Sequence, residues 1–323
     1  MSPSIRSVPR LLAGLLALAS LVAAAEEKPI RILVGFAPGS TSDTVARVVA
    51  DKLRTSLSTP VVVENRAGAN GMLAAEAVKA ASPDGRTLML APIAVTVFAP
   101  LTHANLRYDP VKDFAPVSLA ANFQFALAVS PGSSSKTLRE HLAAMRANPS
   151  TAVLGVPVSG GPGHFLGVMV ARATGIDVAF VPYKGGGPLV SDLMGNQVPA
   201  GIALVSDMVA QHDAGKLRIL ATSGSVRSPV TPDVPTFREL GFPALDVAGW
   251  HAFYVTAGTP RETVGRLSAA IASAIKAPEV RERMLALGLE PVGSTADELA
   301  RQMADDTGKW APAVKASGFR AEP

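Results

Sequence analysis

The residues best suited to chemistry lie in two glycine-rich segments that each join an apolar run to a helical pattern. Residues 35–43 (GFAPGSTSD) follow the apolar run 30–34, and residues 159–164 (SGGPGH) follow the run 152–156. Small residues let backbone N–H groups approach a ligand, and the first turn of a helix attracts anions. We interpret the two segments as the two halves of a carboxylate-binding site. Residue types alone support equally well that both are ordinary strand-to-helix turns, which are common.

Few other side chains are arranged for catalysis or metal binding. Asp43 stands where the first helix is expected to begin, so N-capping is favoured over a direct role toward ligand or water, and the two roles are compatible. His164 is the only one of the five histidines that we place at the site; the others are expected to be structural or at the surface. The histidines lack HExxH-like spacing and the chain has no cysteine, so neither a metal site nor a cofactor is predicted.

Composition indicates an exported globular protein. Hydrophobic residues make up 48% of the 323 residues and charged residues 17%. Arg6 and Arg10 precede an apolar run at residues 11–25 that is shorter than the roughly 20 residues needed to cross a bilayer and that ends in small residues at 23–25. Residues 1–25 are therefore predicted to be a signal peptide, with a membrane anchor as the alternative. The remaining 28 basic and 26 acidic residues are too balanced to indicate nucleic acid or an anionic membrane as a partner.

The order of predicted elements indicates an α/β chain with two lobes. Strands are expected at 28–36, 60–64 and 86–91 and helices at 43–57 and 72–81, an alternation typical of a parallel sheet covered on both faces. A long β-type run at 114–130, interrupted at residue 122, is expected to carry the chain to a second sheet. There the alternation restarts, with strands at 152–156, 178–181, 200–205 and 217–222.

The remaining chain is expected to return to the first lobe. Residues 223–260 are rich in proline and glycine, with one short helix at 236–240 and a strand at 251–255. Helices are predicted at 261–275, 279–287 and 296–310. The predicted lobes are 26–121 plus 223–323 for the first and 122–222 for the second.

Several segments, in this order, resemble one family. They are residues 35–47 (GFAPGSTSDTVAR), 62–71 (VVENRAGANG), 83–88 (PDGRTL), 108–117 (YDPVKDFAPV), 181–185 (VPYKG), 214–218 (AGKLR), 232–236 (PDVPT) and 257–260 (AGTP). Each motif is weak alone, but the ordered set is specific and covers residues 28–320. The chain resembles the Bug-type (Bordetella uptake) solute-binding proteins, the periplasmic receptors of tripartite tricarboxylate transporters.

The resemblance implies a two-lobed periplasmic-binding-protein fold (type II) with a ligand cleft between the lobes. It also implies a periplasmic, non-enzymatic receptor without cofactor, which we expect to be monomeric. The implied partners are a small organic acid and the membrane subunits of the transporter. The ligand-binding residues implied by residues and resemblance together are Phe36, Gly39, Ser40, Thr41, Ser42, Asp43, Ser159, Gly161, Gly163, His164, Tyr183, Ala203 and Trp250. Without the resemblance, Trp250 is more readily interpreted as a core residue than as a cleft residue.

The departures from the family pattern concern the ligand. Residues 91–93 (API) replace a frequent Gly-Thr-Ser, residues 203–204 (AL) replace a frequent acidic position, and Ser40 replaces a frequent glycine. The first two changes remove polar groups from the expected cleft. They predict an aromatic or aliphatic monocarboxylate rather than citrate or an amino acid. Two alternatives remain: a secreted hydrolase using Ser159 and His164, although the nucleophile elbow is missing, and a ligand sensor for a signalling membrane partner.

Overall fold

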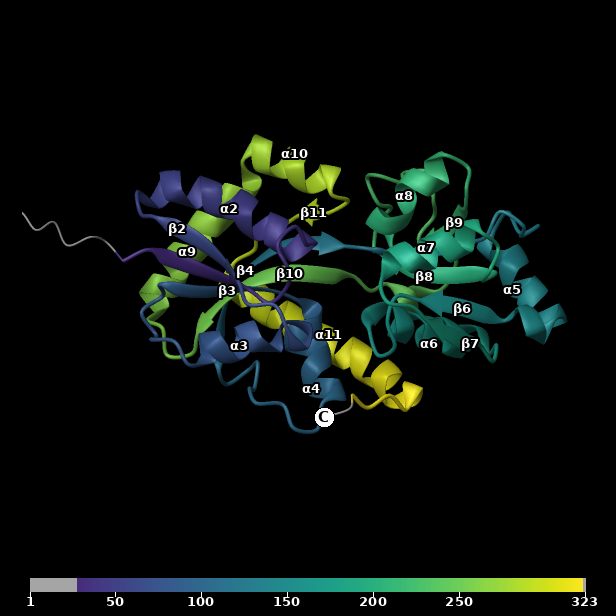
Figure 1. Cartoon of the computed structure of the whole chain (residues 1–323), viewed down its shortest axis with the longest axis horizontal. Helices are drawn as coiled ribbons and strands as arrows, with labels where there is room; N and C mark the ends of the chain where they lie inside the picture. The colour runs from purple at the N-terminus through teal and green to yellow at the C-terminus, as the bar shows by residue number, and fades with distance from the viewer. Residues whose placement is uncertain (1–27, 322–323) are drawn as a thin grey trace, which may run out of the picture.

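The computed structural model describes residues 28–321, which form two α/β lobes side by side (Figure 1). The first sheet has the strand order β11 (Glu290–Pro291), β4 (Phe114–Phe123), β10 (Gly249–Thr256), β3 (Thr87–Pro92), β1 (Ile30–Val34) and β2 (Val61–Asn65). The second has the order β7 (Ala179–Pro182), β6 (Val153–Val156), β8 (Ala200–Leu204), β5 (Phe125–Val129) and β9 (Arg218–Thr222). The predicted α/β architecture with two sheets is confirmed.

Helices cover both sheets. Those of the first lobe are α2 (Thr41–Leu57), α3 (Met72–Lys79), α4 (Ala99–Thr102), α9 (Arg261–Lys276), α10 (Pro278–Ala286) and α11 (Ala296–Ser317). Those of the second are α5 (Leu138–Ala147), α6 (Pro162–Thr174), α7 (Gly186–Met194) and α8 (Val205–Asp213). Strand β1 pairs in parallel with β2 and β3, and β6 with β7 and β8. Their carboxyl ends therefore lie at one edge of each sheet, where ligands of such folds bind.

The chain passes between the sheets at Gln124. Strand β4 ends one residue before it and β5 begins one residue after it, so the predicted sheet-to-sheet run is confirmed, with its break at Gln124 rather than residue 122. After β9, the N–H of Val247 donates to the carbonyl of Ser223, which keeps the return segment on the second sheet until β10 begins. The lobe limits at 121/122 and 222/223 stay a prediction. Residues 236–240 form a hydrogen-bonded turn, not the expected helix.

Helix α11 contacts both lobes. In the first lobe, the Trp310 ring meets Phe98 edge-on with centroids 5.0 Å apart. Toward the second lobe, the Arg172 guanidinium of α6 donates to the Pro312 carbonyl over 3.1 Å. The C-terminal helix thus joins the two lobes on one side of the molecule (Figure 1).

The described helices were compared with the length and hydropathy that a membrane span requires. Among residues 28–321, no helix is both long enough and apolar enough to cross a bilayer. The predicted signal peptide at 1–25 lies outside the described residues.

The turn after β1 depends on a close approach between two backbones. A Cβ on Gly35 would lie 2.4 Å from the Cα and 2.7 Å from the carbonyl oxygen of Gly71. Backbone atoms cannot rotate away as a side chain can, so Gly35→Ala is expected to lower the free energy of unfolding by about 3 kcal/mol. The matched control is Gly308→Ala in α11, where nothing lies within 4 Å of the new Cβ and helix propensity predicts a slight gain in stability. Urea unfolding of both variants measures the difference, and equal stabilities would contradict it.

Candidate functional site

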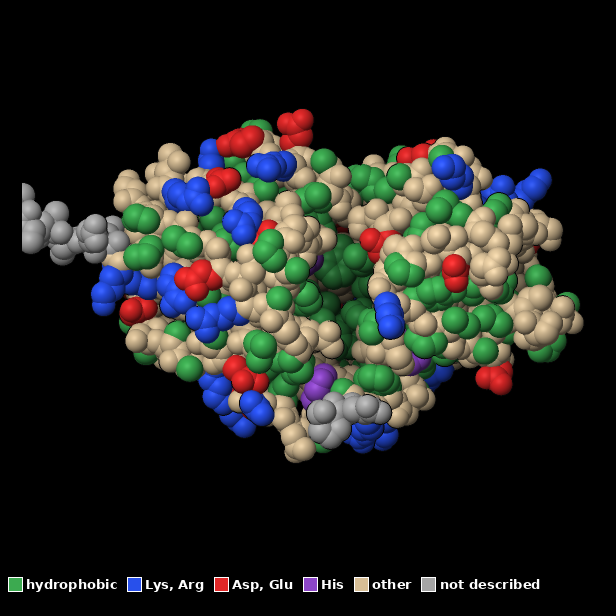
Figure 2. Space-filling model, in the orientation of Figure 1, with side chains coloured by type: hydrophobic (Ala, Val, Ile, Leu, Met, Phe, Trp, Pro, Cys, Tyr) green, Lys and Arg blue, Asp and Glu red, His purple; other side chains and the backbone are tan. Residues whose placement is uncertain are grey.

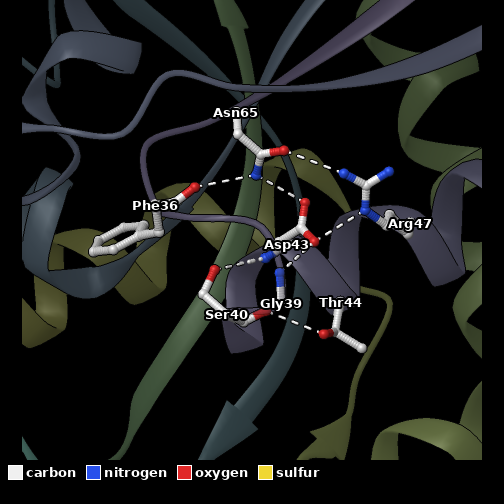
Figure 3. Close-up of polar contacts among 7 residues, drawn as sticks. All are labelled: Phe36, Gly39, Ser40, Asp43, Thr44, Arg47 and Asn65. Carbon is white, nitrogen blue, oxygen red and sulfur yellow. Dashed lines mark hydrogen bonds and ion pairs between the residues drawn. The ribbon is translucent and has the colours of Figure 1, made fainter.

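Asp43 holds the turn between β1 and α2 (Figure 3). Its Oδ2 accepts hydrogen bonds from the Gly39 N–H and from Arg47 Nε, each over 2.9 Å, and its Oδ1 accepts one from Asn65 Nδ2 over 2.8 Å. Burial alone would raise the pKa of Asp43, but the hydrogen bonds from Arg47, Gly39 and Asn65 outweigh it and lower the pKa. The carboxylate is therefore ionised and fully engaged by the protein, which fits the predicted role in fixing the turn.

The N-cap of α2 is Ser40, not Asp43. Helix α2 begins at Thr41, and Ser40 Oγ accepts a hydrogen bond from the Asp43 N–H over 3.3 Å. The expectation that Asp43 caps the helix is therefore wrong, because Asp43 is its third residue. From this position the Asp43 side chain accepts a hydrogen bond from the Gly39 N–H, while the Ser40 side chain accepts one from the Asp43 N–H. The reciprocal pair resembles a capping box.

Two backbone donors of this turn remain available. The Gly39 N–H is occupied by Asp43, and the Ser40 N–H donates to the Ala37 carbonyl over 3.1 Å. The N–H groups of Thr41 and Ser42, in contrast, have no acceptor among residues 28–321. They are the groups that can bind an anion at the start of α2, whereas Gly39 is not free to do so through its N–H.

Phe36, in the turn after β1, contacts Asn65 and Gly71, which lie at and after the end of β2. Its carbonyl accepts a hydrogen bond from Asn65 Nδ2 over 3.1 Å, and its ring lies against Gly71, where a Cβ would come within 3.0 Å of it. Its side chain is half-buried. Phe36 therefore connects the turn after β1 to the one after β2.

The second predicted turn leads into α6. Gly161 is its N-cap without a side-chain cap, and Pro162 at the first position has no N–H. The N–H groups of Gly163 and His164 find no acceptor within the described part of the chain. This turn thus also presents two backbone donors at a helix start, as α2 does.

His164 is part of the second turn rather than a free base. Its Nδ1 accepts a hydrogen bond from the Gly160 N–H over 3.1 Å, its ring meets Phe180 edge-on, and burial lowers its pKa. Ser159 is exposed, and residues 28–321 contain no hydrogen bond between Ser159 and His164. The pair that a hydrolase would need is not assembled.

A third helix start, that of α7, is covered by the chain's own carboxylate. The Asp207 carboxylate packs on Gly186, where a Cβ would lie 2.1 Å from Oδ2. The pKa of Asp207 is raised, because protein atoms replace part of the water around its carboxylate. An anion at the start of α7 would meet this carboxylate, so of these three helix starts those of α2 and α6 are open.

Three predicted site residues point away from these turns. The Tyr183 hydroxyl donates to Asp192 within the second lobe over 3.0 Å. Ala203 has no exposed surface and belongs to the core of the second lobe. Trp250 also has no exposed surface, and its Nε1 donates to Asp306 of α11 over 2.7 Å. In this conformation Ala203 and Trp250 cannot contact a ligand, so the cleft position that the resemblance implies for Trp250 is not seen.

A hollow lies between the lobes, with hydrophobic side chains on its floor (Figure 2). The first turn of α2 lies beside this space (Figure 1). Among residues 28–321, no group of three or more His, Asp or Glu side chains is placed to hold a metal ion. The arrangement offers hydrogen-bond donors next to an apolar surface, which suits an anion with an apolar body.

Sequence reasoning did not identify three residues that support the first turn. Arg47 was detectable as the residue four after Asp43, the spacing of a helical ion pair. Asn65 was detectable because it ends β2 at the same sheet edge as the turn. His251 donates to or accepts from Ser42 across a long sequence separation, and no local signal predicts that contact.

Comparison with known proteins agrees with this geometry. Residues 45–319 match the family model described as tripartite tricarboxylate transporter family receptor. The chain is 34% identical to Protein BugT of Bordetella pertussis over 297 residues, which cover 91% of this chain and 90% of BugT. Members of this family are solute-binding proteins and not enzymes, which overturns the hydrolase alternative.

Solved structures of similar proteins share the fold over nearly their whole length. The periplasmic binding protein BugD has a TM-score of 0.74 at 29% identity, covering 92% of this chain and 99% of that chain. MatC from Rhodopseudomonas palustris with bound malate has a TM-score of 0.73 at 31% identity (88% and 98%). R. palustris Rpa4515 with adipate has a TM-score of 0.77 at 27% identity (90% and 98%). The chain therefore belongs to the Bug-type receptors of the tripartite tricarboxylate transporter family.

Proposed function

We propose that this chain is a monomeric periplasmic receptor, exported by a cleaved signal peptide, that binds a small organic carboxylate between its lobes. The observation that carries the proposal is the turn at the start of α2. Asp43 fixes it so that the N–H groups of Thr41 and Ser42 point to no acceptor among the described residues. The start of α6 repeats this arrangement in the second lobe. Closure of the lobes on a carboxylate would satisfy both pairs of donors, and the membrane subunits of the transporter then receive the ligand.

The ligand we propose has an apolar body, aromatic or aliphatic. The hydrophobic floor of the hollow supports this class. Ala91, Ile93 and Ala203 no longer support it, because all three residues are buried in the core. Of the two ligands named for the related structures, adipate has the apolar body and malate does not.

The decisive experiment is a binding panel with a matched pair of variants. Adipate, benzoate, malate, citrate and aspartate are compared by thermal shift and calorimetry. We expect binding of benzoate or adipate, and a loss of affinity of at least about tenfold in Thr41→Glu, whose carboxylate occupies the anion position. An acidic residue in the first turn favours the helix, so folding is retained, and Thr41→Gln is the uncharged control.

Three results would overturn the proposal. The first is that no carboxylate of the panel binds. The second is equal affinity of Thr41→Glu and wild type for the bound acid. The third concerns the ligand class alone: binding of citrate or aspartate with no effect of benzoate or adipate. Uptake of the labelled acid by a deletion strain, restored by wild type but not by Thr41→Glu, tests delivery to the membrane subunits.

A further inference from the structure

A buried histidine lies beneath the anion-binding turn. His251 of β10 is 5% exposed, and its Nε2 lies 3.0 Å from Ser42 Oγ, in the first turn of α2. Strand pairing places His251 opposite Pro92 of β3 and Ala121 of β4, in the middle of the first sheet. Its ring packs against Phe123 with centroids 5.2 Å apart. The position of the imidazole is thus fixed by the sheet, independently of the turn above it.

The contacts of His251 determine where its proton lies. Burial lowers its pKa to about 4, so the ring is neutral near neutral pH and carries one N–H. Its Nδ1 is buried and has no hydrogen-bond partner among residues 28–321. A buried N–H without an acceptor is less tolerated than a buried lone pair without a donor. The proton therefore sits on Nε2, which donates to Ser42 Oγ.

This tautomer has a consequence for Ser42. Its oxygen accepts from His251, so its own O–H proton must point elsewhere, and no acceptor for it exists in the described part of the chain. The N–H groups of Thr41 and Ser42 lie in the same helical turn and also lack acceptors. We propose that His251 is a positioning residue that turns the Ser42 hydroxyl into a third donor for the ligand's carboxylate.

The inference rests on the proposed function and specifies the chemical group recognised. These three donors match an ionised carboxylate, whose oxygens only accept. A neutral carboxamide would bring its N–H₂ group against these donors and leave part of them unpaired. The site therefore selects the acid over its amide.

Nuclear magnetic resonance of the full chain, labelled with nitrogen-15, tests both parts. The first measurement is the His251 tautomer in the absence of ligand, expected to be Nε2–H. The second is a titration with acetate, the smallest carboxylate probe, followed at the amides of Thr41 and Ser42. The acetate dissociation constant is expected to rise about tenfold in Ser42→Ala and in His251→Leu, with no further rise in the double variant. His251→Gln, whose side-chain N–H can replace Nε2–H, should stay within about threefold of wild type and also controls for folding.

The outcomes separate this inference from the proposed function. An Nδ1–H tautomer, or losses that add in the double variant, would overturn the role of His251 while acetate binding at α2 stands. Equal acetate affinity of Ser42→Ala and wild type would overturn the third donor. Acetate that shifts neither amide in the wild-type protein would overturn the proposed function itself, and the inference with it.

Discussion

Asp43→Ala is expected to lower the free energy of unfolding by about 3 kcal/mol and to abolish carboxylate binding. The carboxylate accepts three hydrogen bonds on its two oxygens and is 3% exposed. Removing it leaves the Gly39 N–H and one of the two N–H groups of the Asn65 amide without an acceptor, and it releases the turn that orients the N–H groups of Thr41 and Ser42. Urea unfolding and calorimetry with adipate or benzoate measure the two effects.

Arg47→Ala is the matched control for this change. Arg47 bonds the same carboxylate, but about half of its side chain is exposed (51%), so solvent replaces it at a cost of less than about 1 kcal/mol. The turn should survive in Arg47→Ala, because the bonds of Asp43 to Gly39 and Asn65 remain. If Asp43→Ala and Arg47→Ala lower the free energy of unfolding equally, then Asp43 stabilises the protein through its ion pair with Arg47 and not through its hydrogen bonds to Gly39 and Asn65.

Acidification is expected to destabilise the fold, and among the buried histidines His141 and His251 have the largest effects. Burial lowers the pKa of both His141 and His251 to about 4, from an ordinary value near 6.5. Between these two pKa values each histidine is protonated in the unfolded chain but neutral in the folded chain. The free energy of unfolding therefore falls as the pH falls from about 6.5 to about 4. Each histidine accounts for about 3 kcal/mol over this range, and above about pH 7 neither contributes a slope.

The measurement is urea unfolding of the wild type, His141→Gln, His251→Gln and the double variant across this pH range. Burial raises the pKa of Asp207, Glu290 and Asp306, and these carboxyl groups act in the opposite direction by favouring the folded state when protonated. The comparison of each variant with wild type is therefore decisive, not the wild-type slope alone. Each single variant should remove its own share of the acid destabilisation, and unchanged slopes in both would contradict the expectation.

The sequence predicted what depends on local patterns. Alternating apolar runs and small-residue turns predicted both sheets, and the long run at 114–130 predicted the passage from one sheet to the other. Helix starts were placed within a few residues; α2 begins at Thr41 instead of residue 43 because Ser40 takes the capping role. Such signals lie within one turn of chain, and so they survive without tertiary information.

Contacts between distant residues were not predictable in this way. Trp250 and Asp306 meet because α11 packs on β4, the neighbour of β10, and His251 meets Ser42 because β10 enters the sheet beside β3. In both cases the local sequence is that of a strand, with no indication of which helix covers it. The same limit explains why the carboxylate of Asp207 at the start of α7 was not foreseen.

The position of β10 in the first sheet also has a kinetic consequence. This strand lies between β3 and β4, yet the whole sequence of the second lobe separates it from them. All strand pairs of the second sheet, in contrast, form within residues 125–222. Because distant pairings must overcome a larger loop-closure entropy, the second lobe is the faster folding unit. Until β10 arrives, β3 and β4 have open edges, and insertion of this one strand both completes the sheet and brings His251 beneath the turn.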